Sequence, residues 1–160
     1  MPARELENLA QLRGLVGQEV AASDWLAVTQ ERIEQFAEAT EDRQWIHVDA
    51  ARAAHESPFG GTIAHGFLTL SLIAGLMERS LAVSGLRMAI NYGLNRVRFV
   101  APVPSGARVR ARFLLASLEE VKGGAQQATW KVNLEREGDG RTCCVAEWLV
   151  RYYSEVTSDE

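Results

Sequence analysis

The segment that decides the fold is IAHGFLTLSLIAGLM, from Ile63 to Met77. Its apolar residues leave no continuous polar face on the helix that we expect from about Ala64 to Ser80, and such a helix must be surrounded by protein. The segment is too short to cross a bilayer and it contains His65, Thr69 and Ser71. It therefore predicts a buried helix and not a membrane span.

The residues after this helix can supply the surrounding protein. Four segments are strand candidates: INYGLNRVRFVAP, ARVRARFLLASLEEV, AQQATWKVNLERE and TCCVAEWLVRYY, with turns at PVPSG, KGG and GDG. In the second, Val109, Ala111 and Phe113 alternate with arginines, which is typical of a strand with one buried face. Short turns favour an antiparallel sheet. We expect an α+β fold in which the sheet wraps around the helix, the hot-dog fold.

The first half of the chain reads as mostly helical. A first strand is expected within Glu19–Val28, and Thr29 then has the character of a helix N-cap for a helix that runs to about Thr40. Asp49 can cap a second, short helix, AARAAHE. The segment SPFGGT, with its proline and two glycines, is expected to be a loop.

Length and composition limit the classes of function. The chain has 160 residues, 47% of them hydrophobic, and we expect one domain, 1–160, with its core at about 18–154. A net charge of −4 gives no broad basic face, so nucleic acid is not an expected partner, and neither is a membrane. The adjacent Cys143 and Cys144 are expected to be reduced and the N-terminus has no secretory pattern, which together predict a cytoplasmic protein.

Known catalytic and metal motifs are missing from the sequence. His47, His55 and His65 are spaced unlike a compact metal motif and have no cysteine pair beside them, so we expect no metal. The chain also has no Gly-x-Ser-x-Gly nucleophile motif and no phosphate-binding glycine loop.

The loop TEDRQWIHVDAARAA, Thr40 to Ala54, holds an aspartate and a histidine five residues apart. In a turn before a capped helix, Asp42 and His47 can converge on one water molecule and act as an acid–base pair. The apolar neighbours Trp45 and Ile46 would exclude solvent and bring the pKa values of the pair toward neutrality. The alternative is a polar loop in which Asp42 serves only as a cap and His47 bonds a backbone carbonyl.

Gly66 stands where the loop GGTIAHGF enters the apolar helix. The first turn of a helix has free N–H groups and the positive end of the helix dipole, so the Gly66 amide could stabilise a carbonyl oxygen that gains negative charge. The alternative is that glycine permits close packing of the helix on a strand. His65 reads as a structural histidine.

Three segments in this order resemble the MaoC-like dehydratases, the family of (R)-specific enoyl-CoA hydratases: DRQWIH, AHGFLTLS and INYGLNRVRF followed by PVPSG. The family hallmark is an Asp-x-Asn-Pro-x-His loop followed by His-Gly at the start of a central helix. Here Gln44 and Trp45 replace Asn-Pro, as in the NodN-like branch of the family. Trp45 would then hold the turn by packing.

The resemblance implies hydration of a trans-2-enoyl-CoA to an (R)-3-hydroxyacyl-CoA, or the reverse dehydration. Asp42 and His47 would activate the water, and the Gly66 amide would bind the thioester oxygen. It implies no cofactor beyond the coenzyme A of the substrate, whose phosphates would meet Arg96 or Arg98; the alternative is that these arginines are solvated charges on the sheet. It also implies a homodimer, with an acyl tunnel near the subunit interface and with Phe67 and Leu70 as candidates for its wall.

Two other functions fit the same fold. A hot-dog thioesterase usually places its acid on the central helix, and here Glu78 lies at the far end of that helix. A non-catalytic subunit that binds acyl-CoA or acyl-carrier protein is the second, and the presence of both Asp42 and His47 argues against it.

Overall fold

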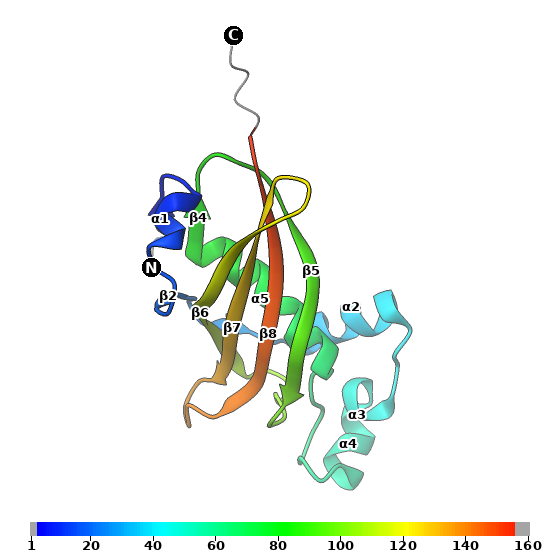
Figure 1. Ribbon diagram of the computed structural model, residues 1–160. Helices are drawn as coiled ribbons and strands as arrows, with labels where there is room; N and C mark the ends of the chain where they lie inside the picture. The colour runs from blue at the N-terminus through cyan, green and yellow to red at the C-terminus, as the bar shows by residue number, and fades with distance from the viewer. Residues whose placement is uncertain (1–2, 156–160) are drawn as a thin grey trace.

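A curved antiparallel sheet packs against one long helix in the computed structural model, which describes residues 3–155 (Figure 1). The helix is α5, Gly66–Ser80. The strands that cross it are β5 (Leu86–Phe99), β6 (Arg108–Val121), β7 (Ala125–Arg136) and β8 (Thr142–Ser154). The sheet order is β2-β6-β7-β8-β5, where β2 is Glu19–Ala22, and the short β3 (Leu26–Ala27) also pairs with β6. All these pairings are antiparallel, so the α+β hot-dog arrangement expected from the sequence is confirmed.

The inward side chains of the central strands form the core, as their alternation predicts. Val109, Ala111 and Phe113 are fully buried on β6, and Trp130 and Leu134 are fully buried on β7. The Phe113 and Trp130 rings meet edge to face with their centroids 6.4 Å apart. The Trp130 indole N–H also needs a partner because it is buried, and it donates to the Tyr152 hydroxyl at 3.0 Å.

The central helix begins later than the expected Ala64. Ile63 makes an isolated antiparallel bridge with Pro104, and the Ala64 amide donates to the Val103 carbonyl at 2.8 Å. These contacts keep the segment extended until His65, which is the N-cap residue of α5.

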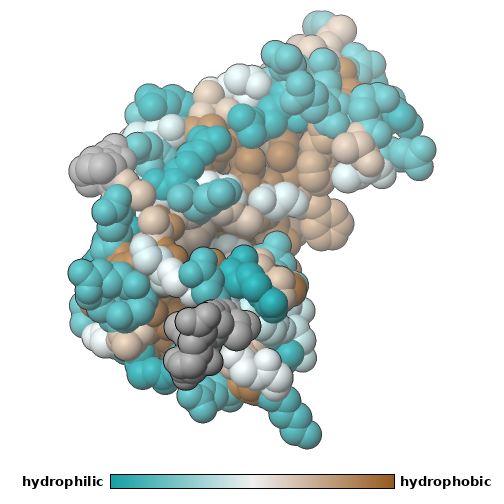
Figure 2. All heavy atoms as spheres, turned by 90° about the horizontal axis from the view of Figure 1, so that it is seen from above, coloured by the Kyte–Doolittle hydropathy of each residue, from teal (hydrophilic) through white to brown (hydrophobic). Residues whose placement is uncertain are grey.

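The helix is covered on one face only by the described residues. Leu68, Ile73, Leu76 and Met77 are buried, whereas the Phe67 side chain is 68% exposed. Strand β5 lies at the sheet edge and is also rich in exposed apolar side chains. Figure 2 shows hydrophobic residues gathered in a hollowed part of the surface. The expected enclosure of the helix is therefore incomplete within one chain.

Of the described helices that precede α5, three lie near its N-terminal end (Figure 1). Helix α2 is Gln30–Thr40 with its N-cap at Thr29, as predicted, and the Thr29 hydroxyl accepts from the Arg32 amide. Helix α3 is Trp45–Val48, and α4 is Ala50–Glu56 with the predicted cap at Asp49.

The N-terminal region also contains elements that the sequence did not predict. A short helix, α1 (Leu9–Arg13), follows β1 (Arg4–Leu6), which pairs in parallel with β4 (Leu81–Val83). The expected strand at Glu19–Val28 is divided into β2 and β3. Ser23 lies in the break, and its hydroxyl accepts a hydrogen bond from the Ala111 amide at 2.9 Å.

Both cysteines are buried and unbonded, although neighbours in a regular strand face opposite sides. Between Cys144 and Thr142, β8 advances two residues while β7 advances only from Leu134 to Glu135. Cys143 is thus the extra residue of a β-bulge, which explains how it can be buried beside Cys144. Within residues 3–155, no helix is long and apolar enough to cross a membrane.

The indole–phenol pair in the core provides a stability test. Tyr152→Phe removes the acceptor of the Trp130 N–H and leaves a buried donor without a partner, so we expect the free energy of unfolding to fall by about 1–3 kcal/mol. Urea unfolding followed by tryptophan fluorescence measures the change. Tyr153→Phe, on the opposite face of the same strand, is the matched control. Equal stability of the two variants would show that the Trp130–Tyr152 bond contributes nothing.

Candidate active site

The loop after α2 brings an acid toward a histidine. Glu41 ends the helix with a left-handed backbone, φ 65°, which turns the chain away from the helix axis. Asp42 follows on the exposed part of the loop, and His47 is the third residue of α3, with only 6% of its surface exposed. Polar atoms of Asp42, His47 and His65 all lie within 4.8 Å of one another. The structure therefore brings together the pair proposed from the sequence.

A hydrogen bond sets the tautomer of His47. Its Nδ1 lies 2.7 Å from the Ile63 carbonyl oxygen, and because a carbonyl can only accept, Nδ1 must carry the proton. In the neutral ring, Nε2 then has a free lone pair, which is the state that a general base requires. Half of the alternative explanation also holds, since His47 does bond a backbone carbonyl. The bond orients the imidazole ring and leaves its other nitrogen available.

Burial sets the charge of His47. Desolvation lowers the pKa of His47 from its usual value of 6.5; the Ile63 carbonyl opposes this, His65 adds to the lowering, and the Asp42 carboxylate opposes it. The balance lowers the pKa, so His47 is neutral near pH 7. A neutral imidazole can accept a proton from water.

His65 ties the acid loop to the central helix. Its Nε2 donates to the Asp42 carbonyl oxygen at 2.8 Å, and its ring stacks on His47 with centroids 3.8 Å apart and planes at 23°. Phe36 of α2 packs against the other side, 4.9 Å between centroids. The His65 Nδ1 atom is buried and has no hydrogen-bond partner among the described residues. The structural role expected for His65 is thus the positioning of Asp42.

Asp42, His47 and His65 lie close enough together to be considered as metal ligands, but the direction of their lone pairs argues against it. Imidazole lone pairs lie in the ring plane, and a zinc ion would lie about 2.1 Å from each ligating nitrogen. Two rings stacked at 23° cannot both direct a lone pair at one ion over that distance. The arrangement favours proton transfer over metal binding.

Gly66 is the first residue of α5, and its position explains why it has no side chain. A Cβ atom there would lie 2.9 Å from Cδ2 of Phe99, so close packing on β5 requires glycine. The backbone amide is nevertheless available: within residues 3–155, no group accepts a hydrogen bond from it. It borders a mostly apolar hollow of about 300 Å³ that also touches Phe99, Val100 and Cys143. Both explanations of Gly66 apply together.

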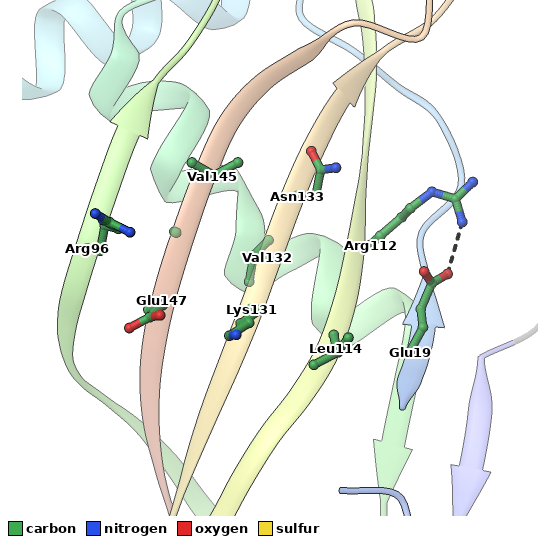
Figure 3. Close-up of a pocket in the computed structure, with 10 residues that line it drawn as sticks. Glu19, Arg96, Arg112, Leu114, Lys131, Val132, Asn133, Val145 and Glu147 are labelled. Atoms are coloured by element: carbon green, nitrogen blue, oxygen red, sulfur yellow. Dashed lines mark hydrogen bonds and ion pairs between the residues drawn. The ribbon is translucent and has the colours of Figure 1, made fainter. Parts of the chain in front are cut away.

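Arg96 and Arg98 lie away from these residues. Arg96 borders a hollow of about 430 Å³ with Lys131 and Glu147. Lys131 stands between the buried Trp130 and Val132, so this hollow is on the face of the sheet turned away from α5 (Figure 3). Arg98 is exposed, and its guanidinium donates to the Val97 carbonyl at 2.7 Å. The structure does not bring either arginine to the Asp42–His47 pair.

Sequence reasoning missed Gln30 and Thr62. The Gln30 side-chain amide donates to the His47 carbonyl at 2.8 Å and accepts from the Thr62 hydroxyl at 2.7 Å. The contacts span 17 and 32 residues, and no local pattern could have indicated them. The sequence predicts Thr29 as a cap, but nothing in it distinguishes Gln30 from the other polar residues of α2.

Trp45 was expected to hold the turn by packing, and the structure shows that its ring packs against Arg52 of the next helix. Its side chain is half-buried, and the Arg52 guanidinium of α4 lies over the ring at 4.3 Å from the centroid. The tryptophan thus joins α3 to α4, and it is not a member of the main core.

Comparisons with known proteins agree with this fold. A family model described as a MaoC like domain matches residues 11–136. The chain is 51% identical over 149 residues to 3-hydroxyacyl-thioester dehydratase Z of Mycobacterium tuberculosis H37Rv, which covers 93% of this chain and 98% of that protein. It is 45% identical over 143 residues to nodulation protein N of Rhizobium leguminosarum bv. viciae, 89% of each chain.

A solved structure of similar shape is the (R)-hydratase from A. caviae involved in PHA biosynthesis. The TM-score is 0.69 at 29% sequence identity, covering 84% of this chain and 94% of that one. The family match extends over most of the chain, and the relatives are similar over nearly their whole length. The chain therefore belongs to the MaoC-like dehydratase family, a family of hydro-lyases.

Proposed function

We propose that this protein is an (R)-specific enoyl-CoA hydratase, which adds water to a trans-2-enoyl-CoA and catalyses the reverse dehydration of an (R)-3-hydroxyacyl-CoA. One observation carries the proposal: the Nδ1–H bond from His47 to Ile63 leaves Nε2 free on a histidine that clusters with Asp42 and with His65, the N-cap of α5. The relatives named 3-hydroxyacyl-thioester dehydratase and (R)-hydratase support the reaction class and its stereochemistry.

The chemistry needs a base on one side and an oxyanion donor on the other. Asp42 and His47 hold one water molecule, and His47 Nε2 takes a proton from it as its oxygen bonds to C3 of the substrate. The electron pair of the double bond moves toward the thioester oxygen, where the Gly66 amide and the helix dipole stabilise the enolate. A proton then passes from the pair to C2, which completes the addition. None of these steps calls for a metal or a redox cofactor.

The acyl chain has a path along the uncovered face of α5. Two hollows of about 230 and 400 Å³ lie between α5 and β5, and they share Ala74, Asn91 and Trp148. Leu70 borders the first hollow, in line with its proposed place in the tunnel wall, and Phe67 stands next to Phe99 with ring centroids 6.0 Å apart. We place the thioester at Gly66 and the alkyl chain in these hollows.

A homodimer would complete this path. Strand β5 is a sheet-edge strand of 14 residues, and among the described residues one of its two sides has no partner strand. Its exposed apolar side chains are Met88, Ile90, Tyr92, Leu94 and Phe99. A long exposed apolar edge favours pairing with another strand, and we propose that a second copy covers it and the bare face of α5.

The thioesterase alternative is less well supported. Glu78 lies about 18 Å along α5 from Gly66 and borders the hollow at the other end of the helix. No described acid on α5 stands near the Gly66 amide. Release of free thiol from acyl-CoA, without hydration of enoyl-CoA, would favour that alternative. Tight acyl-CoA binding without turnover would favour a non-catalytic subunit.

Substitution of the acid–base pair tests the proposal. Asp42→Asn and His47→Gln each remove a proton-transfer group, so we expect kcat for crotonyl-CoA hydration to fall by roughly 10²–10⁴-fold. The loss of ultraviolet absorbance of the enoyl thioester measures the rate. Asp49→Asn and His55→Gln are matched controls, since Asn can still cap α4 and His55 is exposed. Full activity in either of the first two variants would refute the pair.

The pH dependence of the rate tests the role of His47 as a base. Because burial lowers its pKa below 6.5, the fraction of neutral His47 stays high at neutral pH and falls only under more acidic conditions. We expect kcat/KM to decline as the pH falls, with a midpoint below pH 6.5. A rate profile from pH 4 to pH 8 measures this limb. A midpoint at or above 6.5 would contradict a buried base.

Charge on the sheet edge tests the dimer. Ile90→Glu places a carboxylate in the proposed interface, so we expect the protein to shift from dimer to monomer and to lose activity with it. Size-exclusion chromatography with light scattering measures the mass. Val16→Glu, at another exposed apolar side chain, is the control. A wild-type monomer, or an Ile90→Glu variant that stays dimeric, would refute this interface.

A further inference from the structure

We infer that Gln30 is a positioning residue for the active site: its side-chain amide clamps the His47 backbone to the segment that leads into α5. The inference rests on the proposed function in one respect, that His47 is the base. It concerns a residue that contacts neither water nor substrate in the proposed mechanism.

The backbone of Gln30 is held in a fixed position. Gln30 is the first residue of α2, directly after the N-cap Thr29. Two residues earlier, Val28 is bonded on both sides, since its amide donates to the Ala107 carbonyl at 2.8 Å and its carbonyl accepts from the Gly106 amide at 2.7 Å. The Gln30 backbone is thus held by a capped helix and by the end of the sheet.

The orientation of the amide follows from its partners. The His47 carbonyl can only accept, so it must face the Nε2 group of Gln30, at 2.8 Å. Oε1 is then turned to the Thr62 hydroxyl, which donates at 2.7 Å. The reversed amide would place two oxygens against each other at His47. Both ends of the carboxamide are therefore used, and Thr62 is itself buried.

The clamp acts on the atoms that orient the base. The His47 ring is fixed by the Ile63 carbonyl, and Ile63 follows Thr62 directly. One amide therefore holds the backbone of His47 and the residue next to the acceptor of its Nδ1–H. Removal of the amide would let the two segments separate and change the place of Nε2 relative to Asp42. A misplacement of about 1 Å at a catalytic group can cost on the order of 100-fold in rate.

Two substitutions at Gln30 separate the clamp from simple packing. Gln30→Met keeps the length without any hydrogen bond, and Gln30→Glu keeps the acceptor for Thr62 but loses the donor to His47. We expect both to lower kcat by roughly 10–100-fold, with KM changed less than about twofold. Gln35→Met is the matched control, because Gln35 lies exposed on the same helix. Unchanged kcat, or a loss confined to KM, would overturn the inference.

The acid limb of the pH profile gives a readout that a purely structural role would not move. His47 is buried beside Asp42 and His65, and loosening this site would hydrate the ring and let its lowered pKa return toward 6.5. We expect the limb to move to higher pH in Gln30→Met and to stay in Gln35→Met. An unchanged limb in Gln30→Met would count against the clamp.

Substitutions at Thr62 test the same clamp without changing Gln30, and they apply even where the Gln30 variants do not fold. Thr62→Val removes the hydroxyl that orients the amide, and Thr62→Ser retains it. We expect Thr62→Val to lower kcat and Thr62→Ser to restore it. Equal rates in the two variants would overturn the clamp.

Histidine NMR separates this inference from the proposed function. Titration of the imidazole signals reports the pKa and tautomer of His47 without any substrate. If the wild-type protein hydrates no enoyl thioester, the proposed function fails, yet a shift of the His47 titration in Gln30→Met still supports the clamp. If the wild-type protein is active and the His47 titration is the same in Gln30→Met, the clamp fails alone.

Discussion

The structure around the site depends on the reciprocal bonding of two segments, 42–47 and 62–65. The Ile63 amide donates to the Ile46 carbonyl at 3.0 Å, while the Ile63 carbonyl accepts from the His47 ring. His65 closes the set through its bond to the Asp42 carbonyl. The second segment also leads into α5, the helix against which the sheet packs. Asp42 and His47 are therefore oriented by the start of the core helix, and a shift of that helix would move the proposed base.

Much of the fold is predictable because its causes are local. Alternation marked the buried faces of β6 and β7, and side-chain caps marked the starts of α2 and α4. The apolar pattern predicts a helix from about Ala64, but α5 begins at Gly66 because Ile63 and Ala64 bond to residues 104 and 103, far along the chain. The β1–β4 pair joins strands more than seventy residues apart, and three-residue strands carry no pattern of their own.

The features of the site can also be separated into local ones, which the sequence indicates, and long-range contacts, which it does not. The Asp42–His47 spacing and the glycine at the helix start are local features, and both could be read as chemistry. Three other features depend on hydrogen bonds between distant segments, which residue spacing cannot indicate. They are the tautomer of His47, the bond from His65 to Asp42 and the bond from Gln30 to His47. The hollow at Arg96 shows the same limit: the sequence does not show which face of the sheet an arginine occupies, and Arg96 lies on the face opposite α5.

The replacement of Asn-Pro by Gln44 and Trp45 becomes understandable from these contacts. A proline would restrict the turn locally, through its fixed φ. Here the residues before and after Gln44 and Trp45 are held by hydrogen bonds to other segments. Asp42 is held by His65, and His47 is held by Ile63 and by Gln30. Because long-range hydrogen bonds set the turn, positions 44 and 45 need not be rigid. Trp45 can then face Arg52, and the loop is joined to α4 without a change in the direction of the base.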